Sequence, residues 1–311
     1  MKNWETLEYL SPQRARENVV IELAGGLGNQ MFQYTLGQVF AKKFDVELIL
    51  DVSQIGVGGT NHGIALKNFQ LRDNVRFVTS HKKPLGKFLE RVNNSLSHRS
   101  TTYRRLNSRD FYQSTEAGYD EKVLSLDLGK RIKGYYQSFR YADLIRDELI
   151  ADFQLTKPSE WFLITEETAA KENPTMIHVR RGDYLNLKND FGLLSGKYYK
   201  DACMQIAIRN GESSKWIFSD SPELMSELMQ SSGISNWRII VPPSGISPNE
   251  SLKLMSTARN FIMSNSTFSW WSAYLNSEPS SVYAPSNWFK NRTDPIDLLP
   301  SRWLKIPIVW E

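Results

Sequence analysis

The 311-residue chain is longer than most single domains, so one large domain or two of ordinary size are expected. Hydrophobic residues make up 41% and charged residues 23%, which is typical of a globular protein with a buried core. The net charge of +4, from 38 basic and 34 acidic residues, suits a small anionic substrate and is too weak to indicate a nucleic-acid partner.

The cellular compartment is constrained by one cysteine and by the distribution of apolar residues. Cys203 is the single cysteine, so an intramolecular disulfide is excluded and a reducing compartment is the simplest interpretation. The sequence has no run of about 18 apolar residues, and residues 1–20 lack the apolar core of a signal peptide. We therefore expect a cytoplasmic protein without stable transmembrane insertion. The basic stretch 81–92 would allow peripheral attachment at the inner membrane face, although a solvated basic helix is the plainer alternative.

The first half of the chain predicts an α/β unit. A strand at 18–23, a glycine turn, a helix at 31–44 and a strand at 46–52 form a βαβ pattern, which implies a parallel sheet. Residues 53–115 are polar and predict loops with one or two amphipathic helices. A further strand is expected within 130–139 and an amphipathic helix at 142–155.

The second half repeats the alternation after a hinge that proline and polar residues predict at 156–160. The expected strands are 175–179, 215–220, 238–243, 260–265 and 281–285, and the expected helices are 196–210, 221–230, 249–258 and 266–276. The sequence therefore predicts two doubly wound domains, in which ligands bind beyond the carboxyl ends of the strands. The tail, 291–311, is expected to pack back on the first half.

Two adjacent arginines follow the predicted strand 175–179. The guanidinium groups of Arg180 and Arg181 keep their charge and present paired donors suited to phosphate oxygens, so in a cleft they could neutralise a diphosphate. An ion pair with Asp183, or an exposed loop, is the structural alternative. The Arg181-Gly182-Asp183 tripeptide also matches an adhesion motif, which a cytoplasmic location disfavours.

Hydroxyl and amide side chains gather where the predicted helix 266–276 begins. They are Ser264, Asn265, Ser266, Thr267 and Ser269. Free backbone N–H groups and the positive end of the helix dipole make such a position suitable for an anion. Plain N-capping would need only one of these side chains, so their number favours a ligand.

The glycine-rich turn 23–31 resembles a dinucleotide-binding fingerprint, with Asp51 at the end of the next strand. Met31 occupies the place of the last glycine, so the indication of an NAD enzyme is weak. The glycines, Gly26 among them, better suit close approach of a sugar or diphosphate to the backbone.

No metal-binding pattern is present in the sequence. It has no Asp-x-Asp motif and no Cys/His cluster, and its four histidines are scattered. A structural zinc site is excluded, and a magnesium-diphosphate site of the Asp-x-Asp kind is unsupported. Arginine in place of a metal fits this pattern.

Together these stretches resemble the bacterial galactoside alpha-1,2-fucosyltransferases, family 11 of the glycosyltransferases. The resemblance begins at about residue 18. It rests on "GGLGNQMFQY" (25–34), "GYYQSFRY" (134–141), "IHVRRGDY" (177–184), "WIFSDS" (216–221), "MSNSTFSWWSAYL" (263–275) and "APSNWF" (284–289).

The resemblance implies a GT-B fold, in which two Rossmann-like doubly wound domains face a central cleft. The expected division is an acceptor-binding domain at 1–156, a domain that binds GDP-fucose at 157–290, and the tail at 291–311. The implied reaction is inverting, metal-independent transfer of L-fucose from GDP-fucose to the 2-hydroxyl of a terminal galactose, without a cofactor. The acceptor would be an oligosaccharide or a lipid-linked glycan.

The resemblance also implies roles for individual residues. Arg180 would hold the β-phosphate and Arg181 would add charge, while His178 and Asp220 would meet the guanosine. Thr267, Phe268 and Ser269 would line the diphosphate pocket, beside Ser264, Asn265 and Ser266. Asn29 and Gln30, next to Gly26, would face the reacting sugar.

Asp183 is the candidate general base for the acceptor hydroxyl. A pairing of Asp183 with an arginine, or proton transfer to the diphosphate or to solvent, is the alternative. The competing functions are an alpha-1,6- or protein O-fucosyltransferase, a nucleotide-dependent oxidoreductase and a non-catalytic sugar-binding protein.

Overall fold

The computed structural model describes residues 7–56, 63–79, 111–114, 117–185, 188–276 and 281–311, apart from the side chain of Asp183. Contacts divide the chain into two compact units. The first comprises 1–67 and 71–148, and the second comprises 68–70 and 149–311. The basic stretch 81–92 lies outside the described residues.

A parallel sheet forms the centre of the first unit, and its described strands have the order β1-β4-β3-β2-β6-β5. In chain order they are β1 (Glu8–Tyr9), β2 (Val19–Glu22), β3 (Leu48–Asp51), β4 (Val75–Thr79), β5 (Phe111–Gln113) and β6 (Arg131–Lys133). β2 and β3 are short apolar runs, as expected of strands that are covered on both faces. The described helices of this unit and its border are α1 (Pro12–Glu17), α2 (Leu27–Phe44), the 3₁₀ helix η2 (Ala65–Asn68), α5 (Glu121–Leu124), α6 (Phe139–Asp143) and α7 (Arg146–Asp152).

The long helix α2 packs closely on this sheet. A Cβ at Gly37 would collide with the side chains of Leu48 and Ile21, so glycine lets the helix approach the strands. The helix is capped by Asp45, whose N–H bonds the carbonyl of Ala41 and whose left-handed conformation turns the Val46 N–H to the same carbonyl. The buried face of α2 carries glutamines as well as apolar residues.

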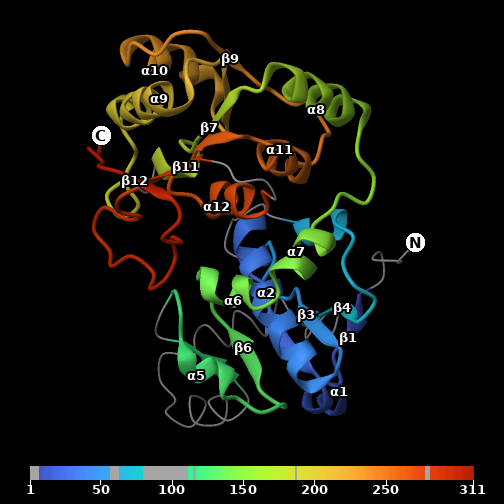
Figure 1. Ribbon diagram of the computed structural model, residues 1–311. Helices are drawn as coiled ribbons and strands as arrows, with labels where there is room; N and C mark the ends of the chain where they lie inside the picture. The colour runs from blue at the N-terminus through green and yellow to red at the C-terminus, as the bar shows by residue number, and fades with distance from the viewer. Residues whose placement is uncertain (1–6, 57–62, 80–110, 115–116, 186–187, 277–280) are drawn as a thin grey trace. The chain divides into compact units, whose positions relative to one another are not determined.

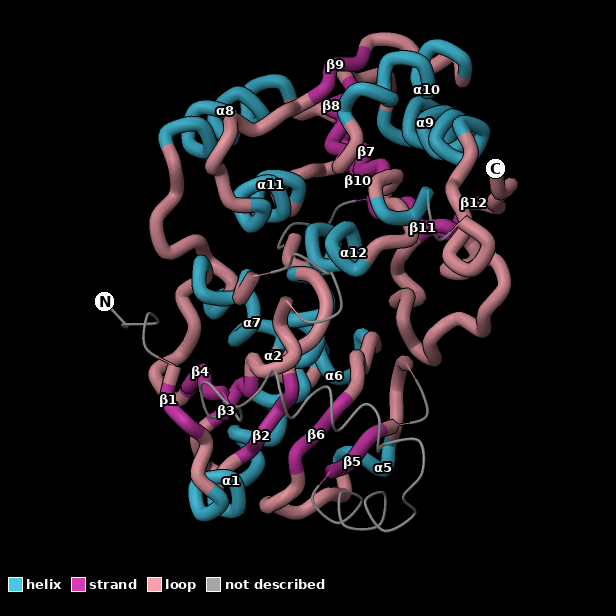
Figure 2. The backbone as a smooth tube through the Cα atoms, turned by 180° about the vertical axis from the view of Figure 1, so that it is seen from behind, coloured by secondary structure: helices cyan, strands magenta, loops and turns pink. Residues whose placement is uncertain are grey.

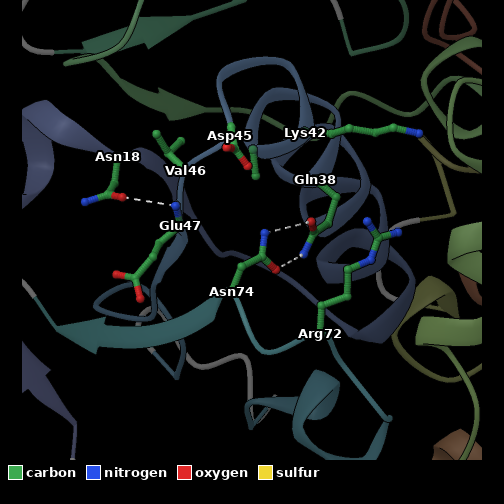
Figure 3. A pocket seen from close by; sticks show the side chains of 9 residues that line it. Asn18, Gln38, Lys42, Asp45, Val46, Glu47, Arg72 and Asn74 are labelled. Atoms are coloured by element: carbon green, nitrogen blue, oxygen red, sulfur yellow. Dashed lines mark hydrogen bonds between the residues drawn. The ribbon is translucent and has the colours of Figure 1, made fainter.

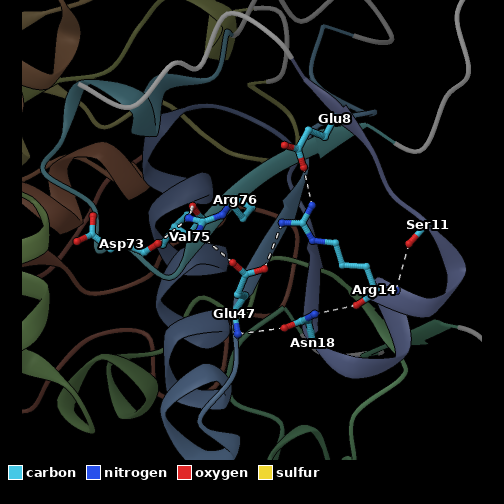
Figure 4. A network of polar contacts seen from close by, with 8 residues as sticks. All are labelled: Glu8, Ser11, Arg14, Asn18, Glu47, Asp73, Val75 and Arg76. Atoms are coloured by element: carbon cyan, nitrogen blue, oxygen red, sulfur yellow. Dashed lines mark hydrogen bonds and ion pairs between the residues drawn. The ribbon is translucent and has the colours of Figure 1, made fainter.

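An ion-pair network ties the first residues of the first unit to its sheet (Figure 4). Arg14 of α1 pairs with Glu8 and with Glu47, and Glu47 also pairs with Arg76. Asn18 adds a hydrogen bond from the Glu47 N–H to its side-chain oxygen, 3.1 Å long. These charges are partly exposed, so each pair stabilises the fold only modestly, by about 1 kcal/mol or less.

The second unit is also built on a parallel sheet, whose described strands have the order β12-β11-β10-β7-β8-β9. The strands are β7 (Thr175–Val179), β8 (Lys215–Ser219), β9 (Trp237–Ile239), β10 (Asn260–Ile262), β11 (Ser281–Pro285) and β12 (Leu304–Ile306). The helices are α8 (Glu160–Glu172), η3 (Asp183–Leu185), α9 (Gly196–Asn210), η4 (Pro222–Leu224), α10 (Met225–Ser231), α11 (Pro248–Met255) and α12 (Thr267–Tyr274).

Helices cover both faces of this second sheet. Figures 1 and 2 show α9 and α10 on one side, with α8 and α11 on the other. Ile177 and Val179 of β7 join the core with Tyr198 and Tyr199 of α9. Because side chains alternate along a strand, the intervening His178 faces the opposite side, where its ring lies 5.4 Å from that of Phe268 of α12.

The predicted α/β class with two Rossmann-like doubly wound domains is confirmed. The strand at 175–179, the helix at 196–210 and the strand at 281–285 have the predicted bounds. The division between the units falls at 148/149, a few residues before the predicted boundary at 156. The cleft expected between the domains stays a prediction.

The tail, 291–311, has a place within the second unit, and its expected packing on the first unit stays a prediction. These residues belong to the second unit, where β12 pairs in parallel with β11. The reason is apolar burial: Trp303 and Ile306 are 5% exposed, and Trp303 makes an edge contact with Trp270 of α12. The tail therefore completes the sheet of the second unit.

Candidate active site

The predicted site residues of the second unit gather at the point where its strand order reverses. β7 comes first in the chain, β8 and β9 extend the sheet on one side, and β10 to β12 extend it on the other. This is the 3-2-1-4-5-6 arrangement of Rossmann domains, in which ligands bind beyond the carboxyl ends of the strands at the reversal point. His178 lies at the end of β7, and Ser264 follows β10.

A buried polar cluster links β7 to α12. The Nδ1 atom of His178 lies 2.8 Å from the Ser264 hydroxyl and 2.7 Å from the Ser269 hydroxyl. The Ser269 hydroxyl also accepts the backbone N–H of Ser264, at 3.1 Å. These contacts fix the imidazole and the chain that leads into α12, so His178, Ser264 and Ser269 are brought together as predicted.

Burial keeps the His178 imidazole neutral. His178 is 4% exposed, and burial, followed by the charge of Arg180, lowers the pKa of its side chain from 6.5 to about 3. A neutral imidazole beside an arginine adds no second positive charge. It serves as a hydrogen-bonding group at any pH near neutrality.

This pKa predicts how stability depends on pH. Between pH 3 and 6.5 the unfolded chain binds a proton at His178 and the folded chain does not, so stability falls as pH is lowered through that window. Lowering the pH from 7.5 to 5.5 is expected to cost roughly 1 kcal/mol through this residue alone. Urea unfolding at the two pH values measures it, and the His178→Gln variant should lose that component. An equal pH dependence in both proteins would contradict the assignment.

The beginning of α12 carries no side-chain cap. Ser266 is the N-cap residue, yet its side chain makes no capping hydrogen bond. Capping by a nearby hydroxyl was the structural alternative for this cluster, and it is not what the structure has. The half-buried Thr267 and Phe268 open the helix, and the N–H groups of a helix's first turn have no partner within the helix.

Asn265, which was predicted to bind GDP-fucose, is buried and bonds the surrounding loops. It is 1% exposed, and its amide donates to the carbonyls of Phe191 and Trp288, at 3.0 and 3.1 Å. Its own carbonyl accepts the Tyr184 hydroxyl at 3.0 Å. Asn265 therefore holds the surrounding loops together.

Arg180 is held by the carboxylate of Asp220. The Arg180 guanidinium lies 3.0 Å from one Asp220 oxygen, and the other oxygen accepts the backbone N–H of Arg181 at 2.9 Å. The side chains of Arg180 and Asp220 are each about a quarter exposed, so ligands can still reach them. A Cβ at Gly182 would collide with the same carboxylate, which explains the glycine at that position.

Arg181, predicted to add charge at the diphosphate, is buried and has protein partners. It is 5% exposed, and its guanidinium makes a two-contact ion pair with Glu311 and donates to the carbonyl of Leu194 at 3.2 Å. Burial alone would lower the pKa of Arg181, and the hydrogen bond and charge of Glu311 raise it above its ordinary value. The guanidinium groups of the adjacent arginines thus have separate partners, while Asp220 also bonds the Arg181 backbone.

Asp183, the candidate base, opens the short helix η3 directly after this loop. The backbone of η3 is fixed by a hydrogen bond from the Leu185 N–H to the Arg181 carbonyl, 2.9 Å long. The side chain of Asp183 lies outside the described part of the chain. Its role as the base stays a prediction.

In the first unit, the glycine turn leads into α2, with Gly26 as its N-cap residue. The Asn29 amide oxygen accepts a hydrogen bond from Gln137 at 2.9 Å, and Asn29 is partly exposed. Gln30 is fully buried and bonds the backbone of Gly25, Gly63 and Ala65, each at 3.0 Å. Gln30 therefore shapes the turn, while Asn29 keeps an accessible side.

Sequence reasoning missed Gln33, Gln137 and Glu311. Gln33 accepts the Ala24 N–H and donates to the Gly134 carbonyl, so it ties the turn after β2 to the turn after β6. The quoted segments 25–34 and 134–141 contain both glutamines, and their amides would have justified a search for loop contacts. No local pattern in the sequence indicated a role for Glu311, because it lies 130 positions from its partner, Arg181.

Two surface hollows are formed by described residues, and Glu311 is among the residues that line the second. One, of about 590 Å³, is in the first unit and is lined by Asn18, Gln38, Ala41, Lys42, Asp45, Val46, Glu47, Arg72 and Asn74 (Figure 3). The Gln38 and Asn74 amides form hydrogen bonds with each other there. The Asn18 amide donates to the Arg14 carbonyl and accepts the Glu47 N–H. The other, of about 530 Å³, lies between α9 and α10. The amides of the first hollow are therefore engaged with neighbouring protein groups.

Two compositional predictions concern absences. Among the described residues, no three histidine, cysteine, aspartate or glutamate side chains are grouped so as to hold a metal ion. No helix in that same part of the chain is both long and apolar enough to cross a bilayer.

Comparison with known proteins identifies the family. Residues 98–297 match the model of glycosyl transferase family 11. An alpha-1,2-colitosyltransferase of Escherichia coli is 27% identical over 93% of this chain and 98% of its own. The O-antigen biosynthesis glycosyltransferase WbnK of Escherichia coli is 27% identical over 86% and 93%. The fucosyltransferase NodZ from Bradyrhizobium superposes with a TM-score of 0.47 at 13% identity, over 82% of this chain and 92% of that one.

The matched family consists of glycosyltransferases, and the chain has the two Rossmann-like domains expected of it. The family match covers more than half of the sequence, so the chain belongs to glycosyl transferase family 11.

Proposed function

We propose that this chain is an inverting, metal-independent glycosyltransferase that moves L-fucose from GDP-fucose to the 2-hydroxyl of a terminal galactose in a glycan. The observation that carries this proposal is that Arg180 follows β7 and an uncapped helix start follows β10, and these two strands are neighbours at the strand reversal of the second unit. A permanent cation and free N–H groups at such a point suit a diphosphate.

Transfer of the sugar requires that the leaving group, GDP, be stabilised. Breaking the bond between sugar and phosphate places additional negative charge on GDP and gives the fucosyl ring oxocarbenium character. Donors that are held in position before the reaction are worth most, because no reorganisation is needed when the charge develops. Arg180, fixed by Asp220, and the first N–H groups of α12 are such donors.

The remaining site residues support this binding. Thr267 and Phe268 would contact the diphosphate through the start of α12, while Ser264 and Ser269 position His178. His178 stays neutral and would bond the nucleoside from the end of β7. Asp220 is engaged with both arginines, so its contact with the guanine would be an additional role.

The acceptor would bind to the first unit. Gly26 and Asn29 lie at the beginning of α2, beyond the carboxyl end of β2, where the strand order of the first sheet also reverses. The amide of Asn29 is held by Gln137 and suits a sugar hydroxyl. The buried Gln30 would maintain the shape of the turn.

Asp183 is proposed as the general base that takes the proton of the acceptor hydroxyl, on the face opposite GDP. The Asp183→Asn variant should lower kcat by about a hundredfold or more while the affinity for GDP stays unchanged. Steady-state rates with GDP-fucose and acceptor, together with GDP titration, measure both quantities. A near-normal kcat would eliminate Asp183 as the base.

Metal independence is part of the proposal. Transfer should proceed at an unchanged rate in excess chelator, because arginine supplies the positive charge that a divalent ion would otherwise bring. Loss of activity in chelator and its return with magnesium would contradict this.

Other specificities remain candidates within the same chemistry. The relative named as an alpha-1,2-colitosyltransferase favours a colitosyl donor as the second possibility. An alpha-1,6- or protein O-fucosyltransferase would differ in the acceptor. A screen of both donors against galactose-terminated acceptors, followed by linkage analysis of the product, separates these activities. Binding of GDP-fucose without any transfer or release of GDP would instead indicate a non-catalytic protein.

A further inference from the structure

The last three residues of the sequence, 309–311, form a strap along the chain that precedes α9. The Ser195 N–H donates to the Val309 carbonyl at 3.2 Å, and the Glu311 N–H donates to the Leu193 carbonyl at 3.0 Å. Leu194 and Trp310 form an antiparallel bridge between these two bonds. The strap is therefore attached through its backbone as an additional short strand.

Close packing fixes the strap as well. Gly192 has a φ of +75°, and a Cβ there would collide with the Trp310 ring. An alanine at this position would therefore be strained and would displace Trp310. The strap therefore needs a glycine at position 192, and this packing requirement does not involve a charged group.

The strap places a carboxylate against a buried arginine. Glu311 contacts both terminal nitrogens of Arg181, one of them at 2.7 Å, and the Arg181 side chain is 6% exposed. A buried guanidinium without its carboxylate would remain charged and would have to move or draw in water. Glu311 therefore decides where the Arg181 side chain can lie.

Arg181 in turn fixes the chain at Arg180. The guanidinium of Arg181 is anchored by Glu311 and by the Leu194 carbonyl, while its backbone N–H is anchored by Asp220. Arg180 precedes it directly and shares the Asp220 carboxylate. The chain at the two arginines is thus held by two sets of contacts, those of the Arg181 guanidinium and those of the Asp220 carboxylate.

From this geometry we infer that Glu311 is a positioning residue, which acts through Arg181 to hold Arg180 at the diphosphate of the donor. The inference rests on the proposed function, since it assigns Arg180 to the diphosphate. It removes Arg181 from direct contact with the ligand and gives a role in donor binding to the strap 309–311.

The test is a double-mutant cycle on GDP affinity, measured by calorimetric titration in chelator. Glu311→Gln is expected to weaken GDP binding by about tenfold, because a small displacement of a binding group is costly. In the Arg180→Ala background the same substitution is expected to have no further effect. Guanosine, which has no phosphate, should bind the Glu311→Gln variant and the unaltered protein equally.

Three further variants make the cycle specific. Gly192→Ala should weaken GDP binding in the same way with the Glu311 carboxylate intact, and Glu311→Asp should restore part of the affinity. Glu212→Gln is the matched control, because it breaks the pair between the exposed Glu212 and the buried Lys215 in the same unit, and it should bind GDP normally. If Glu311→Gln does not fold, GDP affinity is compared in the Glu311→Asp and Gly192→Ala variants instead.

The outcomes separate the inference from the proposed function. Normal GDP affinity in Glu311→Gln, or a loss that adds fully to that of Arg180→Ala, would overturn the positioning role alone. An equal loss for guanosine would show a general structural defect and would also overturn it. Failure of the unaltered protein to bind GDP would overturn the proposed function, and the inference with it.

Discussion

Replacing Arg180 with alanine is expected to lower kcat/KM for GDP-fucose at least about a hundredfold. Removing one donor that is aimed at developing charge typically costs about 3–4 kcal/mol, which corresponds to a factor of about a hundred to a thousand. Arg180 is about a quarter exposed and is oriented by Asp220, so it is both accessible and preorganised. Initial rates of GDP release in the presence of acceptor measure the effect.

Arg238→Ala is the matched control for this variant. Arg238 belongs to the same unit, pairs with Glu172 at 2.9 Å and lies over the Trp216 ring, away from the strand reversal. Its loss should leave the kinetics of transfer unchanged. Kinetics of Arg180→Ala equal to those of Arg238→Ala would remove Arg180 from the mechanism.

The second large effect is expected for Asp220→Asn. The amide keeps an oxygen for the Arg181 N–H, but it loses the charge that holds the Arg180 guanidinium. Turnover should fall by about tenfold to a hundredfold, because misplaced donors stabilise the transition state poorly. The same kinetic assay measures the loss.

The Asp220 variant also separates two roles of this carboxylate. If Asp220 orients the arginines, GDP affinity should fall while guanosine affinity stays constant. If it reads the guanine ring, both ligands should lose affinity together. Unchanged turnover would contradict both roles.

The sequence predicted the central strands well because their pattern is local. Residues 175–179 form a short apolar run between Pro174 and the arginines, and the strand has those bounds. The helix at 196–210 ends at Gly211, which has a φ of +82°. Such signals lie within a few residues of the element they define.

Several strands at or near the edges of the sheets were not predicted, because they are defined by their partners. β4 and β5 lie in the polar region 53–115, where loops and helices were expected. β12 spans three residues and is a strand because it pairs with the edge of β11. The predicted helix at 142–155 is divided into α6 and α7, where Leu144 and Ile145 bond carbonyls three residues back.

The candidate site was predictable in location and less so in its internal contacts. Both strands were predicted, but their order in the sheet was not: β7 and β10 are neighbours, so Arg180 and Ser264 follow adjacent strands. The separate partners of the Arg180 and Arg181 guanidinium groups follow from side-chain alternation. Every second side chain points to the same face, so Arg181 lies on the α9 side with Ile177 and Val179. The same alternation can be seen in the sequence, and it would have predicted different roles for the two arginines. The pairing with Glu311 depends on tertiary structure alone.

The most direct test is a crystal structure of the protein with GDP, grown in chelator. The diphosphate is expected within hydrogen-bonding distance of the Arg180 guanidinium and of the Thr267 or Phe268 backbone N–H, with Arg181 still paired to Glu311. A GDP molecule bound away from residues 178–181 and 264–269, or one bridged to the protein by a metal ion, would contradict the proposed function.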